Sequence, residues 1–139
     1  MKKKVFIVVF LIFFTGIFCS AGENHIEVKV LTKTGLSWNG APLPLYKNAK
    51  PEITVLKITI PPGTSLPMHQ HPVINVGYMI SGELTVYCED GKVLHLKEGD
   101  SIVEVVDTWH YGKNQGDQPA VIVVVYAGYE GVPITIYKK

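Results

Sequence analysis

The chain has 139 residues, enough for one domain, with 13 lysines, no arginine and 12 acidic residues. This near-neutral balance predicts no nucleic-acid-binding surface. Because arginine supplies the planar fork that usually clamps phosphates and carboxylates, its absence disfavours phosphorylated or polyanionic ligands.

The first 21 residues have the pattern of a secretory signal peptide. Lysines follow the initial methionine, an apolar run extends from Val5 to Phe18, and small residues precede a cleavage site after Ala21. The run is shorter than the roughly 20 apolar residues that span a bilayer. We therefore predict that residues 1–21 are removed and that residues 22–139 form a periplasmic or secreted domain with no stable membrane span. An uncleaved anchor and a lipoprotein attached at Cys19 are the alternatives.

Removal of this segment changes the charge and the cysteine count. It leaves 13 − 3 = 10 lysines against 12 acidic residues, a net charge of 10 − 12 = −2. Only Cys88 remains, so no intramolecular disulfide can form. We expect Cys88 to behave as a small buried hydrophobic residue on a strand.

The remaining sequence is typical of short strands separated by turns. Ile26, Val28 and Val30 alternate with polar residues, which predicts a half-buried first strand. The proline-rich stretch 41–51 predicts an extended loop or an edge segment, because proline cannot donate to a sheet ladder. Glu89-Asp90-Gly91 predicts the tight turn of a hairpin. Further strands are expected at residues 52–60, 73–80, 83–88, 92–96, 101–106 and 120–126, the last of them central because it is apolar on both faces. The chain shows no helical periodicity, so we predict an all-β, antiparallel jelly roll forming a single small β-barrel.

Two histidines lie two residues apart between Gly63 and Gly82. In an extended segment, His69 and His71 would point to the same face, because side chains alternate along a strand. A third imidazole is available from His110. Three convergent imidazoles are suited to a transition metal.

These residues resemble the cupin superfamily, in its small single-domain form with one conserved barrel. The first cupin motif, G-x5-H-x-H-x3-E-x6-G, is matched by Gly63, His69, His71, Asn75 and Gly82. The second, G-x5-P-x-G-x2-H-x3-N, is matched by Gly99, His110 and Asn114, with Val105 and Asp107 in place of the proline and the glycine. The two motifs and the intervening hairpin occupy residues 63–114.

The resemblance implies that His69, His71 and His110 ligate a divalent metal ion, which could be Fe, Cu, Zn, Mn or Ni. Asn75 stands where the family has a glutamate, and an amide offers only a neutral, weaker oxygen inside or just outside the coordination shell. The site is then either a three-histidine centre with open positions or one that has lost useful metal affinity. Glu104 could face the interior as a base or a substitute oxygen ligand, or could be a solvated strand residue.

Other side chains are assigned by position. His95 alternates with leucines and is expected to face solvent or a neighbouring sheet, and Asn114 is expected to fix the loop after His110 by local hydrogen bonds. Several large side chains could line a ligand cavity or simply pack in the barrel: Tyr78, Met79, Tyr87, Trp109, Tyr111 and Tyr126.

The expected function is that of an exported small cupin that uses its metal on, or to hold, a small organic molecule. If the protein is an enzyme, a metal-dependent dioxygenase or isomerase fits this site. The alternatives are a non-catalytic binding module for metal or a small ligand, and a dimeric cupin with a vestigial site. Small cupins commonly pair, so a homodimer is expected, with residues 26–31 as a plausible exchanged edge.

Overall fold

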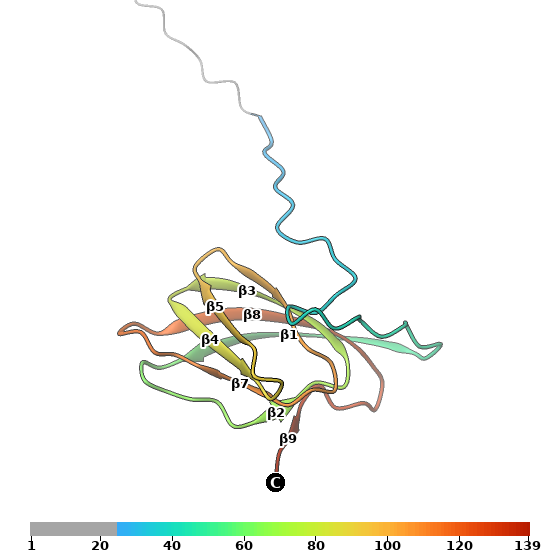
Figure 1. Ribbon diagram of the computed structural model, residues 1–139. Helices are drawn as coiled ribbons and strands as arrows, with labels where there is room; N and C mark the ends of the chain where they lie inside the picture. The colour runs from blue at the N-terminus through green and yellow to red at the C-terminus, as the bar shows by residue number, and fades with distance from the viewer. Residues whose placement is uncertain (1–24) are drawn as a thin grey trace, which may run out of the picture.

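The computed structural model describes residues 25–139, which contain nine strands and no helix. One antiparallel sheet has the order β1-β8-β3-β6, formed by Pro51–Ile60, Ala120–Tyr129, Ile74–Ser81 and Ser101–Val103. The other has the order β5-β4-β7-β2-β9, formed by Val93–Lys97, Glu83–Cys88, His110–Lys113, His69–Gln70 and Ile136–Tyr137. The two sheets face each other as a jelly-roll sandwich (Figure 1). The all-β, antiparallel prediction is confirmed, although the sheets do not close into one hydrogen-bonded ring.

The core lies between the sheets and follows the two-residue period of the strands. Along β8, Ile122, Val124 and Tyr126 are buried, whereas Val125 points outward and is partly exposed. β8 pairs with β1 over ten positions and with β3 on its other side. Its predicted central position is therefore confirmed, because an internal strand needs apolar residues on the face that packs against the core.

The hairpin between β4 and β5 forms where the turn residues predict it. Gly91 adopts a φ of 83°, a conformation that glycine accepts without strain. The Lys92 amide donates to Asp90 Oδ1 at 3.0 Å, and the Cys88 amide donates to the Lys92 carbonyl at 3.0 Å. Cys88 itself is buried, as expected.

The predicted first strand over Ile26, Val28 and Val30 is wrong. Residues 25–34 form no strand, and the three apolar side chains are 92%, 84% and 73% exposed. In Figure 1 this segment runs away from the two sheets. An alternating pattern gives a strand only where the backbone pairs with a neighbouring strand. Thr32 Oγ1 lies 2.6 Å from Ser101 Oγ of β6, but residues 25–34 pair with no strand of the described chain.

The predicted strand over residues 101–106 is shorter than expected. β6 ends at Val103, although the Glu104 amide still donates to the Asn75 carbonyl at 3.1 Å and Val105 is completely buried. The expected signal peptide, residues 1–21, lies outside the described residues. Among residues 25–139, no helix is long and apolar enough to cross a membrane.

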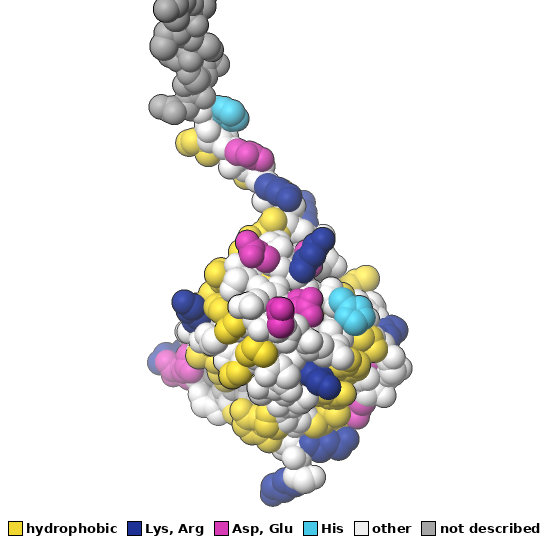
Figure 2. All heavy atoms as spheres, turned by 90° about the vertical axis from the view of Figure 1, so that its left-hand side faces the viewer, with side chains coloured by type: hydrophobic (Ala, Val, Ile, Leu, Met, Phe, Trp, Pro, Cys, Tyr) yellow, Lys and Arg dark blue, Asp and Glu magenta, His cyan; other side chains and the backbone are white. Residues whose placement is uncertain are grey.

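On the face drawn in Figure 2, lysine and acidic side chains are intermingled with patches of apolar side chains. This distribution agrees with the near-neutral composition.

Candidate metal centre

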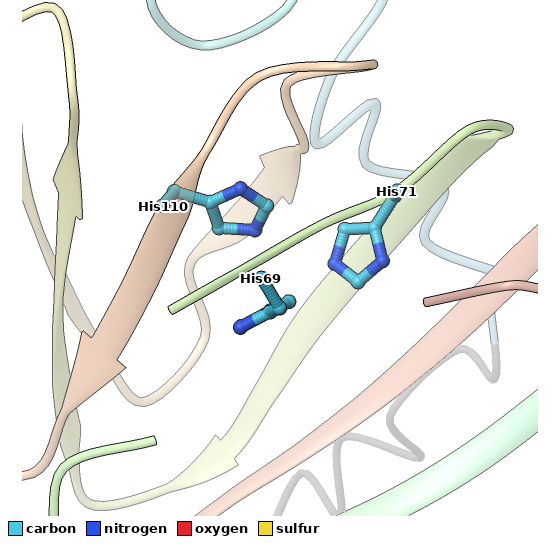
Figure 3. A group of neighbouring side chains, drawn as sticks. All are labelled: His69, His71 and His110. Atoms are coloured by element: carbon cyan, nitrogen blue, oxygen red, sulfur yellow. The ribbon is translucent and has the colours of Figure 1, made fainter. Parts of the chain in front are cut away.

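Three histidines meet at one point, two from β2 and the residue that follows it and one from β7. His69 begins β2 and lies opposite His110, the first residue of β7, while His71 follows β2 and bridges to Val106. One ring nitrogen from each residue lies within 4.8 Å of the other two. The three side chains are buried, and their rings surround a common space (Figure 3).

The other ring nitrogen of each histidine is held by a backbone carbonyl. Nδ1 of His69 lies 2.7 Å from the Pro67 oxygen, Nδ1 of His71 lies 2.8 Å from the Ile134 oxygen, and Nδ1 of His110 lies 2.9 Å from the Thr108 oxygen. A carbonyl only accepts hydrogen bonds, so each Nδ1 carries the proton. Each Nε2 is therefore left with a free lone pair, which is the form that binds a metal.

The electrostatic environment keeps the three rings neutral. Burial lowers the pKa of His71 to about 4, and it also lowers the pKa of His69 and of His110. The carbonyl bonds oppose this effect without reversing it, because burial disfavours the imidazolium more strongly. Nε2 of His110 has no hydrogen-bond partner among the described residues. Three neutral, convergent imidazoles, one with an orphaned buried nitrogen, could bind a divalent transition metal ion.

Glu104 lies beside this cluster rather than in solvent. Its side chain is 12% exposed, and Oε2 is 3.5 Å from His110 Nε2 without forming a hydrogen bond. Burial raises the pKa of the Glu104 carboxyl to about 7, although the nearby His69 acts in the opposite direction. The carboxyl thus titrates near neutral pH when no cation is present.

Asn75 lies on β3, on the face of the sheet that points into the sandwich. It is completely buried, and neither its Oδ1 nor its Nδ2 has a hydrogen-bond partner among residues 25–139. A buried amide with both ends unpaired is unusual, because buried polar groups normally find partners. The interior next to the histidines therefore contains polar atoms that the protein itself leaves unsatisfied.

A small cavity opens next to the imidazoles. Its volume is about 170 Å³, and apolar and aromatic side chains dominate its lining: Leu56, Ile58, Leu66, Pro67, His69, His71, Tyr126, Thr135 and Tyr137. Burial, with a contribution from Glu104, raises the pKa of Tyr126 to about 12, so its hydroxyl stays protonated. Larger hollows of about 460 and 450 Å³ lie at the surface around Glu83 and Lys97, away from the three-histidine cluster.

The aromatic candidates behave differently from one another. Only Tyr126 lines the cavity beside the histidines. Tyr87 and Tyr111 stack on each other with ring centroids 4.9 Å apart, and Tyr78 is exposed on the outer face of β3. Met79 is 1% exposed and belongs to the core.

Sequence reasoning missed the segment after β8. Thr135 and Tyr137 line the cavity, and the Ile134 carbonyl orients His71. The available signal was the alternation of residues 134–137, Ile-Thr-Ile-Tyr, which is typical of a short strand.

His95 lies outside the cluster, and Asp107 occupies the glycine position of the second motif. His95 is exposed, with Nδ1 3.0 Å from Thr85 Oγ1, as expected for a residue outside the cluster. Asp107, which replaces the glycine of the second motif, has a φ of 51°. This is the left-handed conformation, which an aspartate tolerates better than most residues other than glycine do.

The comparisons with known proteins agree with this geometry. The sequence model described as "Cupin domain" matches residues 56–126. No curated protein matches the chain significantly. Among solved structures, an uncharacterized protein with a double-stranded beta-helix domain from Klebsiella pneumoniae is 25% identical, with a TM-score of 0.55 over 68% of this chain and 90% of that chain.

Two enzymes share the fold over parts of their length. The DMSP lyase DddQ from Ruegeria pomeroyi is 20% identical, with a TM-score of 0.55, over 71% of this chain and 47% of that chain. The Bacillus subtilis oxalate decarboxylase, described with Mn(II) centres, is 27% identical, with a TM-score of 0.51, over 61% of this chain and 23% of that chain. This chain thus spans less than half the length of either enzyme.

Proposed function

Because the chain belongs to the cupin family, we propose that it binds one divalent transition metal ion through Nε2 of His69, His71 and His110 and holds or transforms a small organic molecule in the adjoining cavity. The observation that carries this proposal is the convergence of three neutral imidazoles whose Nδ1 atoms are all held by backbone carbonyls. Such outer hydrogen bonds fix the ring orientation and the tautomer that a metal requires.

The donor set restricts the choice of metal. Imidazole suits Fe, Cu, Zn and Ni, and a nearby carboxylate extends the choice to Mn. When bound, such an ion supplies Lewis acidity or a binding position for oxygen. The protein's own part is to keep the imidazoles neutral, to exclude water with apolar walls and to orient the ligand.

The cavity favours a small and uncharged ligand. Drug-sized ligands usually occupy pockets of about 300–1,000 Å³, and this cavity measures about 170 Å³. Its lining has no lysine, and the chain has no arginine, so no cationic side chain is present to hold a carboxylate or a phosphate. Tyr126, Thr135 and Tyr137 offer hydroxyls as the polar anchors.

Metal analysis tests the proposal most directly. The chain without residues 1–21, purified without chelators or an affinity tag of histidines, is expected to contain about one metal ion, and H71A and H110A to contain almost none. H95A is the matched control, because this histidine is exposed and lies outside the cluster. Less than about a tenth of an equivalent in the unaltered protein would refute the proposal.

Catalysis and plain binding are distinguished by turnover. If the protein is a dioxygenase or an isomerase, loading with Fe(II), Cu(II), Zn(II), Mn(II) or Ni(II) should give oxygen consumption or product formation with small phenols, diketones or sugars. Tight ligand binding with no turnover for any metal would favour the non-catalytic binding module. An H69A/H71A protein that keeps its metal content and its activity would favour a vestigial site.

Export and pairing complete the proposal. The signal-like segment supports a periplasmic or secreted protein, and the mature N-terminus found by mass spectrometry after expression of the full chain tests cleavage after Ala21. A homodimer is supported by the outer face of the four-stranded sheet, which exposes several apolar side chains: Ile53, Val55, Val76, Tyr78, Ile80 and Val125. V55K should then shift the mass measured by analytical ultracentrifugation from dimer to monomer. K57E, at the next outward position, is the control for a change of charge without loss of an apolar side chain. A monomeric unaltered protein would disprove pairing.

A further inference from the structure

Asn75, on β3, lies directly opposite Glu104, the residue that follows β6. β3 and β6 pair in the register Tyr78↔Ser101, Gly77↔Ile102 and Val76↔Val103. One step further along the same ladder, the Glu104 amide donates to the Asn75 carbonyl at 3.1 Å. Residues directly opposite on an antiparallel pair project to the same face, with Cβ atoms about 4.5–5.5 Å apart.

This face points into the sandwich, toward the histidines of the opposite sheet. Asn75 is completely buried and Glu104 nearly so, and the carboxylate atom Oε2 lies 3.5 Å from His110 Nε2. Two ligands that each bind an ion at about 2.1 Å in tetrahedral geometry lie about 3.4 Å apart. The separation of these two atoms is therefore what two ligands of one ion would show.

Both atoms are also unsatisfied. Glu104 Oε2 and His110 Nε2 are buried, and neither has a hydrogen-bond partner among the described residues. A buried carboxyl without a partner is strongly disfavoured unless a cation or a hydrogen-bond donor compensates it. A divalent ion held by three neutral imidazoles would satisfy both atoms at once.

We propose that Glu104 supplies the carboxylate ligand of this metal centre, from the strand opposite the position that the first cupin motif assigns to glutamate. The inference rests on the proposed three-histidine site. The centre then has three imidazole nitrogens and one carboxylate oxygen, and the asparagine at position 75 leaves room for a side chain that reaches in from the end of β6. The first motif lacks its glutamate, and Glu104 would supply a carboxylate to the centre from the side of His110.

The test removes the carboxylate from position 104 and then places one at position 75. Co(II) is titrated into metal-free protein lacking residues 1–21, and its affinity by calorimetry and its visible absorption spectrum are recorded. E104Q should weaken Co(II) binding by about tenfold or more and change the spectrum, because an amide is a poorer ligand. N75E/E104Q should restore both. E98Q, at an exposed glutamate, should behave like the unaltered protein.

The outcomes separate this inference from the metal site itself. Unchanged affinity and spectrum in E104Q would overturn the assignment of Glu104 while leaving the three-histidine site intact. Weaker binding with an unchanged spectrum and no recovery in N75E/E104Q would also overturn it, because the carboxylate would then act from outside the coordination shell. No Co(II) binding by the unaltered protein would overturn the three-histidine site as well. The thermal midpoint of metal-free E104Q, expected to equal or exceed that of the unaltered protein, shows that the variant folds.

Discussion

The side-chain amide of Asn114 donates a hydrogen bond to the carbonyl of Ile60 at 2.9 Å, joining the loop after β7 to the end of β1. The same amide donates to the Gln118 carbonyl at 2.8 Å, and Asn114 Oδ1 accepts from the Gly116 amide at 3.0 Å. The side chain is completely buried and uses all its main hydrogen-bonding directions. Asn114 therefore fixes the loop that follows His110, as its place in the second motif predicts.

The first prediction follows from these bonds. N114A removes the donor and the acceptor together, so the buried Ile60 carbonyl loses this partner, as do the Gly116 amide and the Gln118 carbonyl of the partly exposed loop. We expect a loss of about 2–4 kcal/mol in the free energy of unfolding, measured by urea denaturation. N48A, at an exposed asparagine, should change it by less than about 0.5 kcal/mol. Equal stability of the two variants would contradict this account.

The second prediction concerns Gly77 at the centre of β3. An added Cβ would lie 2.8 Å from Ile122 Cδ1 and 2.9 Å from Ile102 Cγ2, closer than real Cβ contacts. G77A should therefore lower the free energy of unfolding by about 1–3 kcal/mol through overpacking. G35A is the control, since nothing lies within 4 Å of its added Cβ. A G77A protein as stable as G35A would show that the core can expand there without cost.

The third prediction concerns the left-handed residue next to the metal centre. Asp107 has a φ of 51°, and its amide donates to the His71 carbonyl at 2.8 Å. D107V places a β-branched side chain in this conformation and should cost about 1–2 kcal/mol in thermal or urea unfolding. D107G relieves the strain and should leave stability equal or higher. A D107V protein that matches D107G would mean that the backbone relaxes to another conformation.

The fourth prediction is a pH dependence of the metal-free protein. The unfolded chain protonates His71 near pH 6.5, whereas the folded protein does so only near pH 4 because the ring is buried. The unfolded state therefore binds more protons in this window, and the free energy of unfolding falls as pH drops from about 6.5 to 4, by about 3 kcal/mol for this residue. Glu104 acts in the opposite sense, because its folded pKa is raised to about 7, so stability falls as pH rises from about 4.5 to 7.

A comparison with H71Q separates the two effects. The difference in stability between the unaltered protein and H71Q should shift against the unaltered protein as pH falls from 6.5 to 4, because Gln does not titrate. The measurement is urea unfolding at several pH values in the presence of a chelator. Parallel curves for the two proteins would mean that His71 is not held neutral by burial.

Local patterns predicted most strands, because the alternation of a strand and the residue types of a turn both depend on residues that are close in the sequence. The hairpin at Gly91 and the apolar strand that became β8 are examples. The segment with Ile26 and Val28 shows the limit of such patterns, because alternation does not reveal whether a partner strand exists. A strand needs a neighbour, and that neighbour lies elsewhere in the sequence.

The candidate site was predictable where it follows a motif and unpredictable where it depends on register. The spacing of His69, His71 and His110 within the two motifs is enough to indicate the cluster. The pairing of Asn75 with Glu104 could not be read from the sequence, because it depends on how β3 aligns with β6 across 29 residues. The contact between the Ile134 carbonyl and His71 Nδ1 could not be read from the sequence either, because the two residues are 63 positions apart.

The three carbonyls that hold the histidine rings also indicate the order in which the rings become oriented during folding. His69 and His110 are each oriented by a carbonyl only two residues earlier, but His71 depends on Ile134, 63 residues away. Contacts between distant segments form later in folding, because the chain must first close a long loop. We therefore expect a folding chain to present two oriented imidazoles first and the third only when the segment after β8 docks. A metal ion present during folding would therefore bind tightly only after the segment that follows β8 has docked, because the site is incomplete before then.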